Sequence, residues 1–122
     1  MASLTLGSTT AIEITAQDAA RAKQFYASVF GWIFSETSGS SMIKIVPQGA
    51  ILGGGIRPES SGSRAGPGGV TVYLSAVDIK KTLEAIEQSG GSILEPAKRQ
   101  EPGFAARFAD TEGNVFGLFS LA

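Results

Sequence analysis

The chain of 122 residues contains an internal repeat, and this repeat limits the folds that it can adopt. Residues 12–18 read IEITAQD, and a similar pattern returns sixty positions later as VYLSAVD at 72–78. Residues 48–53 match 112–117 in the same way, at an offset of sixty-four. The matches share pattern more than identity, as expected of duplicated modules that have diverged. We therefore expect two similar modules.

Each module should begin with a strand that is followed by a capped helix. Asp18 and Asp78 each follow a strand-like run and can accept hydrogen bonds from the first turn of a helix. Apolar residues then recur at helical spacing, and Gly31 and the pair Gly90 and Gly91 supply residues that end helices. Three apolar runs follow each helix, at 33–35, 42–46 and 51–56 in the first module and at 92–94, 105–109 and 115–121 in the second.

These elements predict an α+β fold of two tandem β-α-β-β-β modules, at residues 8–57 and 70–121, whose curved mixed sheets surround a cleft. Residues 58–69 are rich in Gly, Pro and Ser, a composition typical of a linker. Residues 36–41 suit a hairpin loop within the first module. The length fits one compact domain that contains both modules.

Alternation along the strands predicts which side chains point away from the helices. Four apolar residues should pack on the helices: Ile12, Ile14, Val72 and Leu74. Polar and apolar residues then share the opposite face: Glu13, Thr71, Tyr73, Ser75, Ile51, Val115 and Phe119. Such a mixture is typical of a cavity wall, although the solvent-exposed face of an open sheet would also explain Glu13 and Thr71.

The chain has no histidine and no cysteine, which excludes a Ser-His-Asp triad, a thiolate nucleophile, disulfides and metal centres built on these residues. Ten basic and eleven acidic residues are interspersed, so no basic field is available for a nucleic acid. No run has the length of a membrane span, and the first ten residues lack the features of a signal peptide. We expect a cytoplasmic protein with a small-molecule ligand and without nucleic-acid or membrane partners.

Two segments resemble signatures of a known family. Residues 18–32, DAARAKQFYASVFGW, resemble the helix signature of the vicinal oxygen chelate superfamily, and residues 110–117, DTEGNVFG, resemble its last turn and strand. That superfamily includes glyoxalase I, extradiol dioxygenases, fosfomycin-resistance transferases and bleomycin-resistance proteins. The resemblance spans residues 10–120 and implies the same duplicated fold. Because members commonly pair, it also implies a homodimer.

In the metal-dependent members of this superfamily, four strand positions bind one divalent ion. The resemblance carries these positions to Ala11, Gly53, Thr71 and Gly117. None is a strong ligand, because a divalent ion requires several converging carboxylate, imidazole or thiolate donors. We therefore expect that the metal site is lost, that no cofactor is bound, and that Lewis-acid chemistry is absent.

Glu13 and Tyr73 are the candidate catalytic residues, because they occupy equivalent places in the two modules and should face one another. Enclosure by the apolar residues of this face should raise the pKa of Glu13 and suit it to general acid or base catalysis. Tyr73 would then donate a hydrogen bond to an oxyanion. In the alternative interpretation, Glu13 accepts a hydrogen bond from Tyr73 and takes no part in chemistry.

Lys44 and Arg107 are candidate ligand-binding residues, each a single cation within an apolar strand. Alternation places Lys44 on the cavity face, but the sequence leaves the face of Arg107 open. Either cation could bind a ligand carboxylate or extend to solvent at the sheet edge. The other candidate ligand contacts are Thr71, Ser75, Ile51, Val115 and Phe119.

Three functions are compatible with this pattern. The first is a metal-independent protein that binds a small apolar or aromatic molecule, similar to the bleomycin-resistance type. The second is a metal-independent acid/base enzyme, an isomerase, lyase or cyclase, that uses Glu13 and Tyr73. The third is a non-catalytic module for dimerisation or regulation.

Overall fold

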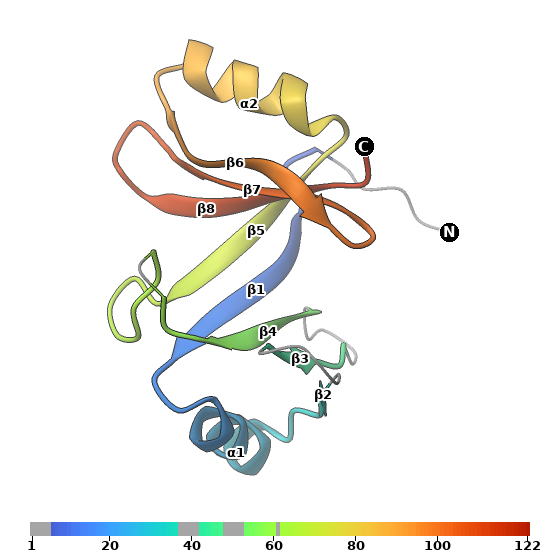
Figure 1. The fold of residues 1–122 in the computed structure, drawn as a ribbon, viewed down its shortest axis with the longest axis vertical. Coiled ribbons are helices and arrows are strands. Elements are labelled where there is room, and N and C mark those ends of the chain that lie inside the picture. Colours follow the sequence, from blue (N-terminus) through green and yellow to red (C-terminus); the bar gives the residue numbers. More distant parts are fainter. Residues whose placement is uncertain (1–5, 37–41, 48–52, 61) are drawn as a thin grey trace. The chain divides into compact units, whose positions relative to one another are not determined.

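The structure is a computed structural model that describes residues 6–36, 42–47, 53–60 and 62–122 (Figure 1). Its internal packing divides the chain into two compact units. The N-terminal unit runs from Ala11 to Thr71, and the C-terminal unit combines Val72–Ala122 with the segment that ends at Thr10.

The N-terminal unit follows the predicted order of strand, helix and three strands. Its four strands are hydrogen-bonded in the order β2-β3-β4-β1. Strand β1 is parallel to β4, whereas β2 with β3 and β3 with β4 are antiparallel. The elements are β1 (Thr9–Ala16), α1 (Ala19–Phe30), β2 (Phe34–Glu36), β3 (Ile43–Ile45) and β4 (Gly53–Pro58).

The C-terminal unit repeats this topology. Its strands are hydrogen-bonded in the order β5-β8-β7-β6, with β5 parallel to β8 and the other pairs antiparallel. The two units together therefore confirm the predicted α+β fold of repeated β-α-β-β-β elements. The elements are β5 (Val70–Ala76), α2 (Ile79–Gln88), β6 (Ser92–Gln100), β7 (Gly103–Ala109) and β8 (Val115–Ser120).

Both helices begin at the predicted aspartate caps. The Asp18 carboxylate accepts a hydrogen bond from the backbone N–H of Arg21 at 3.0 Å, and Asp78 accepts one from Lys81 at 3.2 Å. Helix α1 ends at Gly31, whose φ of 71° is left-handed, as a C-terminal glycine allows. Neither described helix has the length and hydropathy that crossing a membrane requires.

The helix side of each sheet forms a separate apolar core. In the N-terminal unit, Ile14, Ile43 and Ile56 pack with residues of α1, and the rings of Tyr26 and Trp32 stack with centroids 5.0 Å apart. In the C-terminal unit, the strand residues of the core pack on two residues of α2. They are Ala76, Ala106, Phe108 and Leu118 from the strands, and Ile79 and Leu83 from the helix. Strand alternation predicted these faces correctly for Ile14, and for Leu74, which packs against the second core.

Strand β6 is longer than the predicted run at 92–94. It continues to Gln100 through Pro96, and its register to β7 shifts twice. An edge strand tolerates proline and bulges because one side of its backbone needs no partner strand. The predicted hairpin loop at 36–41 lies almost entirely outside the described residues.

The predicted linker at 58–69 is held against the end of β1. The backbone N–H of Thr15 donates to the carbonyl of Gly69 at 2.8 Å, and that of Glu59 donates to Ala16 at 3.1 Å. The Glu59 carboxylate accepts a hydrogen bond from the backbone N–H of Ala65 at 2.9 Å. Although the composition disfavours regular structure, hydrogen bonds therefore fix the described residues of this segment, 58–60 and 62–69.

The turn before β8 contains a carboxylate with a lowered pKa. The side-chain amide of Asn114 donates to Asp110 at 3.1 Å, and the backbone N–H groups of Asn114 and Glu112 each donate at 2.9 Å. These hydrogen bonds favour the charged form, so they lower the pKa of Asp110 from its ordinary value of 3.8, with the Asn114 side chain as the largest cause.

We expect an NMR titration to place the Asp110 pKa below 3.8 and Asn114→Ala to return it toward that value. Because the folded-state pKa is lowered, the stabilisation from this carboxylate is complete above the unfolded-state pKa and is lost as pH falls through the folded-state pKa. In Asp110→Asn, this part of the pH dependence of unfolding should disappear. An Asp110 pKa that Asn114→Ala leaves unchanged would contradict the assignment.

Candidate functional site

A row of four side-chain positions crosses the sheet of the N-terminal unit. In the strand register, Ser35 pairs with Lys44, Lys44 with Gly55, and Gly55 with Glu13. The adjacent residues along the strands are on the other face, where they pack against α1. We call Ser35, Lys44, Gly55 and Glu13 the Gly55 row. It brings together two predicted site residues, Glu13 and Lys44, on the face opposite the helix.

The C-terminal unit has an equivalent row. Glu95 pairs with Arg107, Arg107 with Gly117, and Gly117 with Tyr73. We call these four residues the Gly117 row. The flanking residues Ala106, Phe108 and Leu118 belong to the core on the α2 side, so Arg107 points to the opposite face. The structure thus settles the face of Arg107 and puts it in one row with Tyr73.

The two rows correct the alignment of the last strands. Gly117 pairs with Tyr73, and Gly55 pairs with Glu13, the residue sixty positions before Tyr73. Gly117 is therefore equivalent to Gly55, and not to Gly53, which pairs with Ala11. The error arose because the glycine-rich strand β4 contains three consecutive glycines, which allow more than one alignment. The predicted face is unaffected, since Gly53 and Gly55 lie on the same side of β4.

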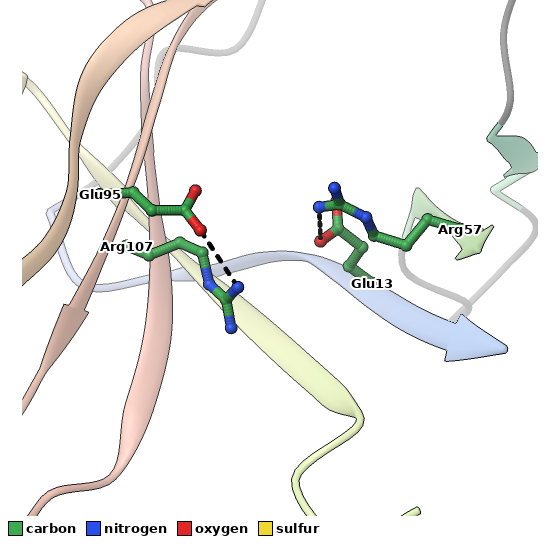
Figure 2. A network of polar contacts seen from close by, with 4 residues as sticks. All are labelled: Glu13, Arg57, Glu95 and Arg107. Atoms are coloured by element: carbon green, nitrogen blue, oxygen red, sulfur yellow. Dashed lines mark hydrogen bonds and ion pairs between the residues drawn. The ribbon is translucent and has the colours of Figure 1, made fainter. Parts of the chain in front are cut away.

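Glu13 forms an ion pair with Arg57 (Figure 2). Arg57 Nη1 lies 2.9 Å from Glu13 Oε1, and 12% of the Glu13 side chain is exposed, against 34% for Arg57. Arg57 pairs with Thr15 in the register and so is a diagonal neighbour of Glu13 on the same face. Arg57 was not among the predicted site residues, although it has the same strand parity as Gly53 and Gly55.

This ion pair corrects the environment predicted for Glu13. We expected apolar residues to enclose the carboxyl group and disfavour its charge, but the structure places a guanidinium against it. Ile51, one of the predicted apolar neighbours, lies outside the described residues.

Arg107 forms an ion pair with Glu95 (Figure 2). Its Nη1 lies 3.3 Å from Glu95 Oε2, and 10% of the Arg107 side chain is exposed, against 43% for Glu95. Arg107 does not extend into solvent, which was one of its two predicted roles. Glu95 was missed because its strand is polar and irregular in pattern.

Neighbouring side chains cover the glycine at the centre of each row. A Cβ atom on Gly117 would overlap the ring of Tyr73, so this ring lies directly on the Gly117 backbone. A Cβ atom on Gly55 would lie 2.6 Å from the sulfur of Met42, so the Met42 side chain covers that glycine. A larger residue in place of either glycine would therefore displace the side chain that covers it.

The remaining predicted contacts differ in accessibility. Lys44 is exposed, Val115 is 40% exposed and Phe119 is half-buried. Thr71 and Ser75 are 3% and 0% exposed, so neither is presented to solvent. One groove of about 420 Å³ lies at the N-terminal end of α1 and reaches Arg21, Phe25 and Ala65, but it contains none of the predicted site residues.

The metal positions implied by the family resemblance do not fit a divalent ion. Ala11, Gly53 and Gly117 have no side-chain donor, and Gly55, the equivalent of Gly117, has none either. Within the described ranges, no group of three or more Asp, Glu, His or Cys residues could hold a metal ion. We therefore assign no reaction step to a metal.

Comparison with known proteins identifies the relatives of this chain. The model of the glyoxalase/bleomycin resistance protein/dioxygenase superfamily matches residues 8–118. A glyoxylase-like domain-containing protein from Didymella fabae is 30% identical over 118 residues, which cover 92% of each chain.

Solved structures with low sequence identity share the fold. Methylmalonyl-CoA epimerase from Mycobacterium tuberculosis has a TM-score of 0.69 and 14% identity, with 100% of this chain and 93% of that chain covered. A glyoxalase/bleomycin resistance protein/dioxygenase superfamily member from Vibrio splendidus 12B01 has a TM-score of 0.65 and 14% identity, with 90% and 96% covered.

Proposed function

The chain belongs to the glyoxalase/bleomycin resistance protein/dioxygenase superfamily, and from this premise we propose that it binds a small apolar or aromatic molecule without a metal ion. The proposed binding surface is the face opposite α2 in the C-terminal unit, where the Gly117 row lies. This fold supports many chemistries, so the residues of the site, and not the fold, determine the function.

The observation that carries this proposal is the aromatic surface around Gly117. The Tyr73 ring lies on the Gly117 backbone, and Phe119 follows two residues later on the same face of β8. Val115, on the other side of Gly117, is 40% exposed. Aromatic and aliphatic side chains beside a few polar groups are typical of a small-molecule site, and rings of this kind stack on aromatic ligands.

Native mass spectrometry of untagged, freshly expressed protein tests this proposal. We expect a non-covalent adduct of small mass that Tyr73→Ala loses, because the stacking surface is removed. Tyr73→Phe should keep the adduct because it retains the ring. Val77→Ala is the matched control, since Val77 is exposed and lies outside the Gly117 row. A Tyr73→Ala variant with normal occupancy, or a stoichiometric divalent metal in the wild type, would contradict the proposal.

Acid/base catalysis without a metal is the second candidate function, as an isomerase, lyase or cyclase. It is favoured by the Glu13 carboxylate, which lies 2.9 Å from Arg57 with 12% of its side chain exposed, because a partly buried carboxylate is a common general base. The molecule recovered as an adduct in native mass spectrometry can be used to distinguish the two functions. If the wild type exchanges a carbon-bound hydrogen of this molecule in D₂O and Glu13→Gln does not, the protein is an enzyme, whereas equal exchange in both excludes Glu13 as the base.

A further inference from the structure

We propose that one flank of α1 is the surface on which a second copy of this chain docks, with the two α1 helices antiparallel across a two-fold axis at Phe25. This flank carries Arg21, Phe25 and Val29, which follow one another at intervals of four residues and which we call the α1 ridge. The ridge lies in the N-terminal unit, whereas the proposed ligand surface lies in the C-terminal unit. The inference therefore does not depend on the proposed function.

Helix α1 presents large apolar side chains to solvent. Residues four positions apart lie on the same side of a helix and form a ridge that can pack into a groove of another helix. Phe25 and Val29 are 55% and 57% exposed, and the adjacent Phe30 and Ile33 are 61% and 49% exposed. The rings of Phe25 and Phe30 have centroids 6.5 Å apart, so the exposed surface is continuous. A continuous apolar surface of this kind marks an interaction site.

The exposed apolar area matches the requirement of a dimer interface. A phenylalanine side chain buries about 200 Å² when it is fully covered, so with Val29 and Ile33 the two exposed phenylalanines present roughly 400 Å² on each copy. A standard interface buries about 800 Å² on each partner, and a little more than half of this area is apolar. The surface of α1 thus supplies most of the apolar area that one copy has to contribute.

A groove beside the ridge can receive a side chain of the second copy. It has a volume of about 420 Å³, and its lining includes Arg21, Ala22, Phe25 and Ala65. In an antiparallel pair with its axis at Phe25, position 29 of one helix lies opposite position 21 of the other, because both are four residues from the axis. Val29 of each copy therefore reaches the groove of the other. A two-fold interface requires this kind of self-complementarity.

The charges of α1 favour the antiparallel arrangement. Arg21 is exposed, and it has no ion pair with the described residues. Lys23, the other charged residue of α1, lies 2.7 Å from Glu36 and is thus already paired. The last turn of α1 contains no basic residue, although the C-terminal end of a helix attracts cations. Antiparallel pairing places Arg21 of each copy beside that end of the other helix and so supplies the missing cation.

Charge reversal at the two-fold axis tests the inference. We expect the wild type to sediment as a dimer at micromolar concentration, and Phe25→Asp and Phe25→Lys each to sediment as monomers, because like charges meet at the axis. An equimolar mixture of the two variants should form a heterodimer, since residue 25 of one copy then meets the opposite charge on the other. Val77→Asp is the matched control, because Val77 is 64% exposed and lies in the C-terminal unit. It should remain dimeric.

The direction of the helices has a separate test. Arg21→Glu should weaken the dimer about tenfold, because it places an anion beside the negative end of the other helix. Arg64→Glu, an exposed arginine outside the ridge, should leave the dissociation constant unchanged. Equal effects of the two substitutions would contradict the antiparallel pairing.

Several outcomes would overturn the inference. A monomeric wild type, or a dimer that Phe25→Asp leaves intact, would exclude the ridge as the interface between copies. Charge variants that keep the circular dichroism of the wild type but do not associate when mixed would exclude a two-fold axis at Phe25. A monomeric wild type that co-sediments with phosphatidylcholine vesicles, and loses this binding in Phe25→Asp, would assign the ridge to a lipid surface instead. None of these results would affect the proposed ligand surface at the Gly117 row.

Discussion

Replacement of Gly54 by alanine is expected to lower the free energy of unfolding of the N-terminal unit by about 3 kcal/mol or more. Gly54 has a φ of 130°, which L side chains rarely adopt, and its Cβ atom would overlap the carbonyl oxygen of Ile12. It pairs with Ile12 and with Ile45, so it lies in the interior of the sheet where the strands cannot separate freely. Urea denaturation of wild type and variant measures the difference.

Gly31→Ala is the matched control for this prediction. Gly31 also has a left-handed φ, of 71°, but no atom lies within 4 Å of its Cβ position. Alanine there is expected to cost about 1 kcal/mol, from backbone strain alone. If the two variants were equally stable, the close approach of β1 and β4 at Gly54 would not be the cause of the loss.

Arg57→Met is expected to cost about 2 kcal/mol, because it leaves the Glu13 carboxylate without its cation. Only 12% of the Glu13 side chain is exposed, so water replaces the lost hydrogen bond poorly. The double variant Glu13→Gln with Arg57→Met should recover most of the loss, since no unpaired charge remains. Thermal or urea denaturation of the four proteins in this cycle measures the coupling.

Arg99→Met provides the comparison for Arg57→Met. It removes an ion pair with Glu101 in which the side chains are 56% and 79% exposed. A loss below about 0.5 kcal/mol is expected there, as for exposed pairs in general. A double variant at Glu13 and Arg57 that is no more stable than Arg57→Met would show that the loss comes from the other contacts of Arg57.

The sequence was sufficient to predict the order of the elements and the faces of several strand residues. The aspartate caps at Asp18 and Asp78 and the glycine at Gly31 are local signals, so they require no knowledge of the tertiary structure. Strand alternation is also a local signal, and it placed Glu13 and Tyr73 opposite the helices. It did not settle Arg107, because a buried cation in a strand of mostly apolar residues fits either face until its partner is known.

The partners of the charged residues could not be predicted in this way. Arg57 and Glu13 are 44 positions apart, and their contact depends on the parallel register of β1 and β4. Glu95 faces Arg107 only because a bulge in β6 shifts the register by one residue. Three expectations stay predictions: that Glu13 and Tyr73 face one another, that the protein forms a homodimer, and that it is cytoplasmic.

The stacking of Tyr26 on Trp32 has a practical consequence for measuring stability. Trp32 is the single tryptophan of the chain, and it belongs to the core of the N-terminal unit. Its intrinsic fluorescence therefore follows the unfolding of that unit, whereas far-ultraviolet circular dichroism follows both. Coincident transitions would show one cooperative molecule, and separate transitions would show that each half of the duplication melts independently.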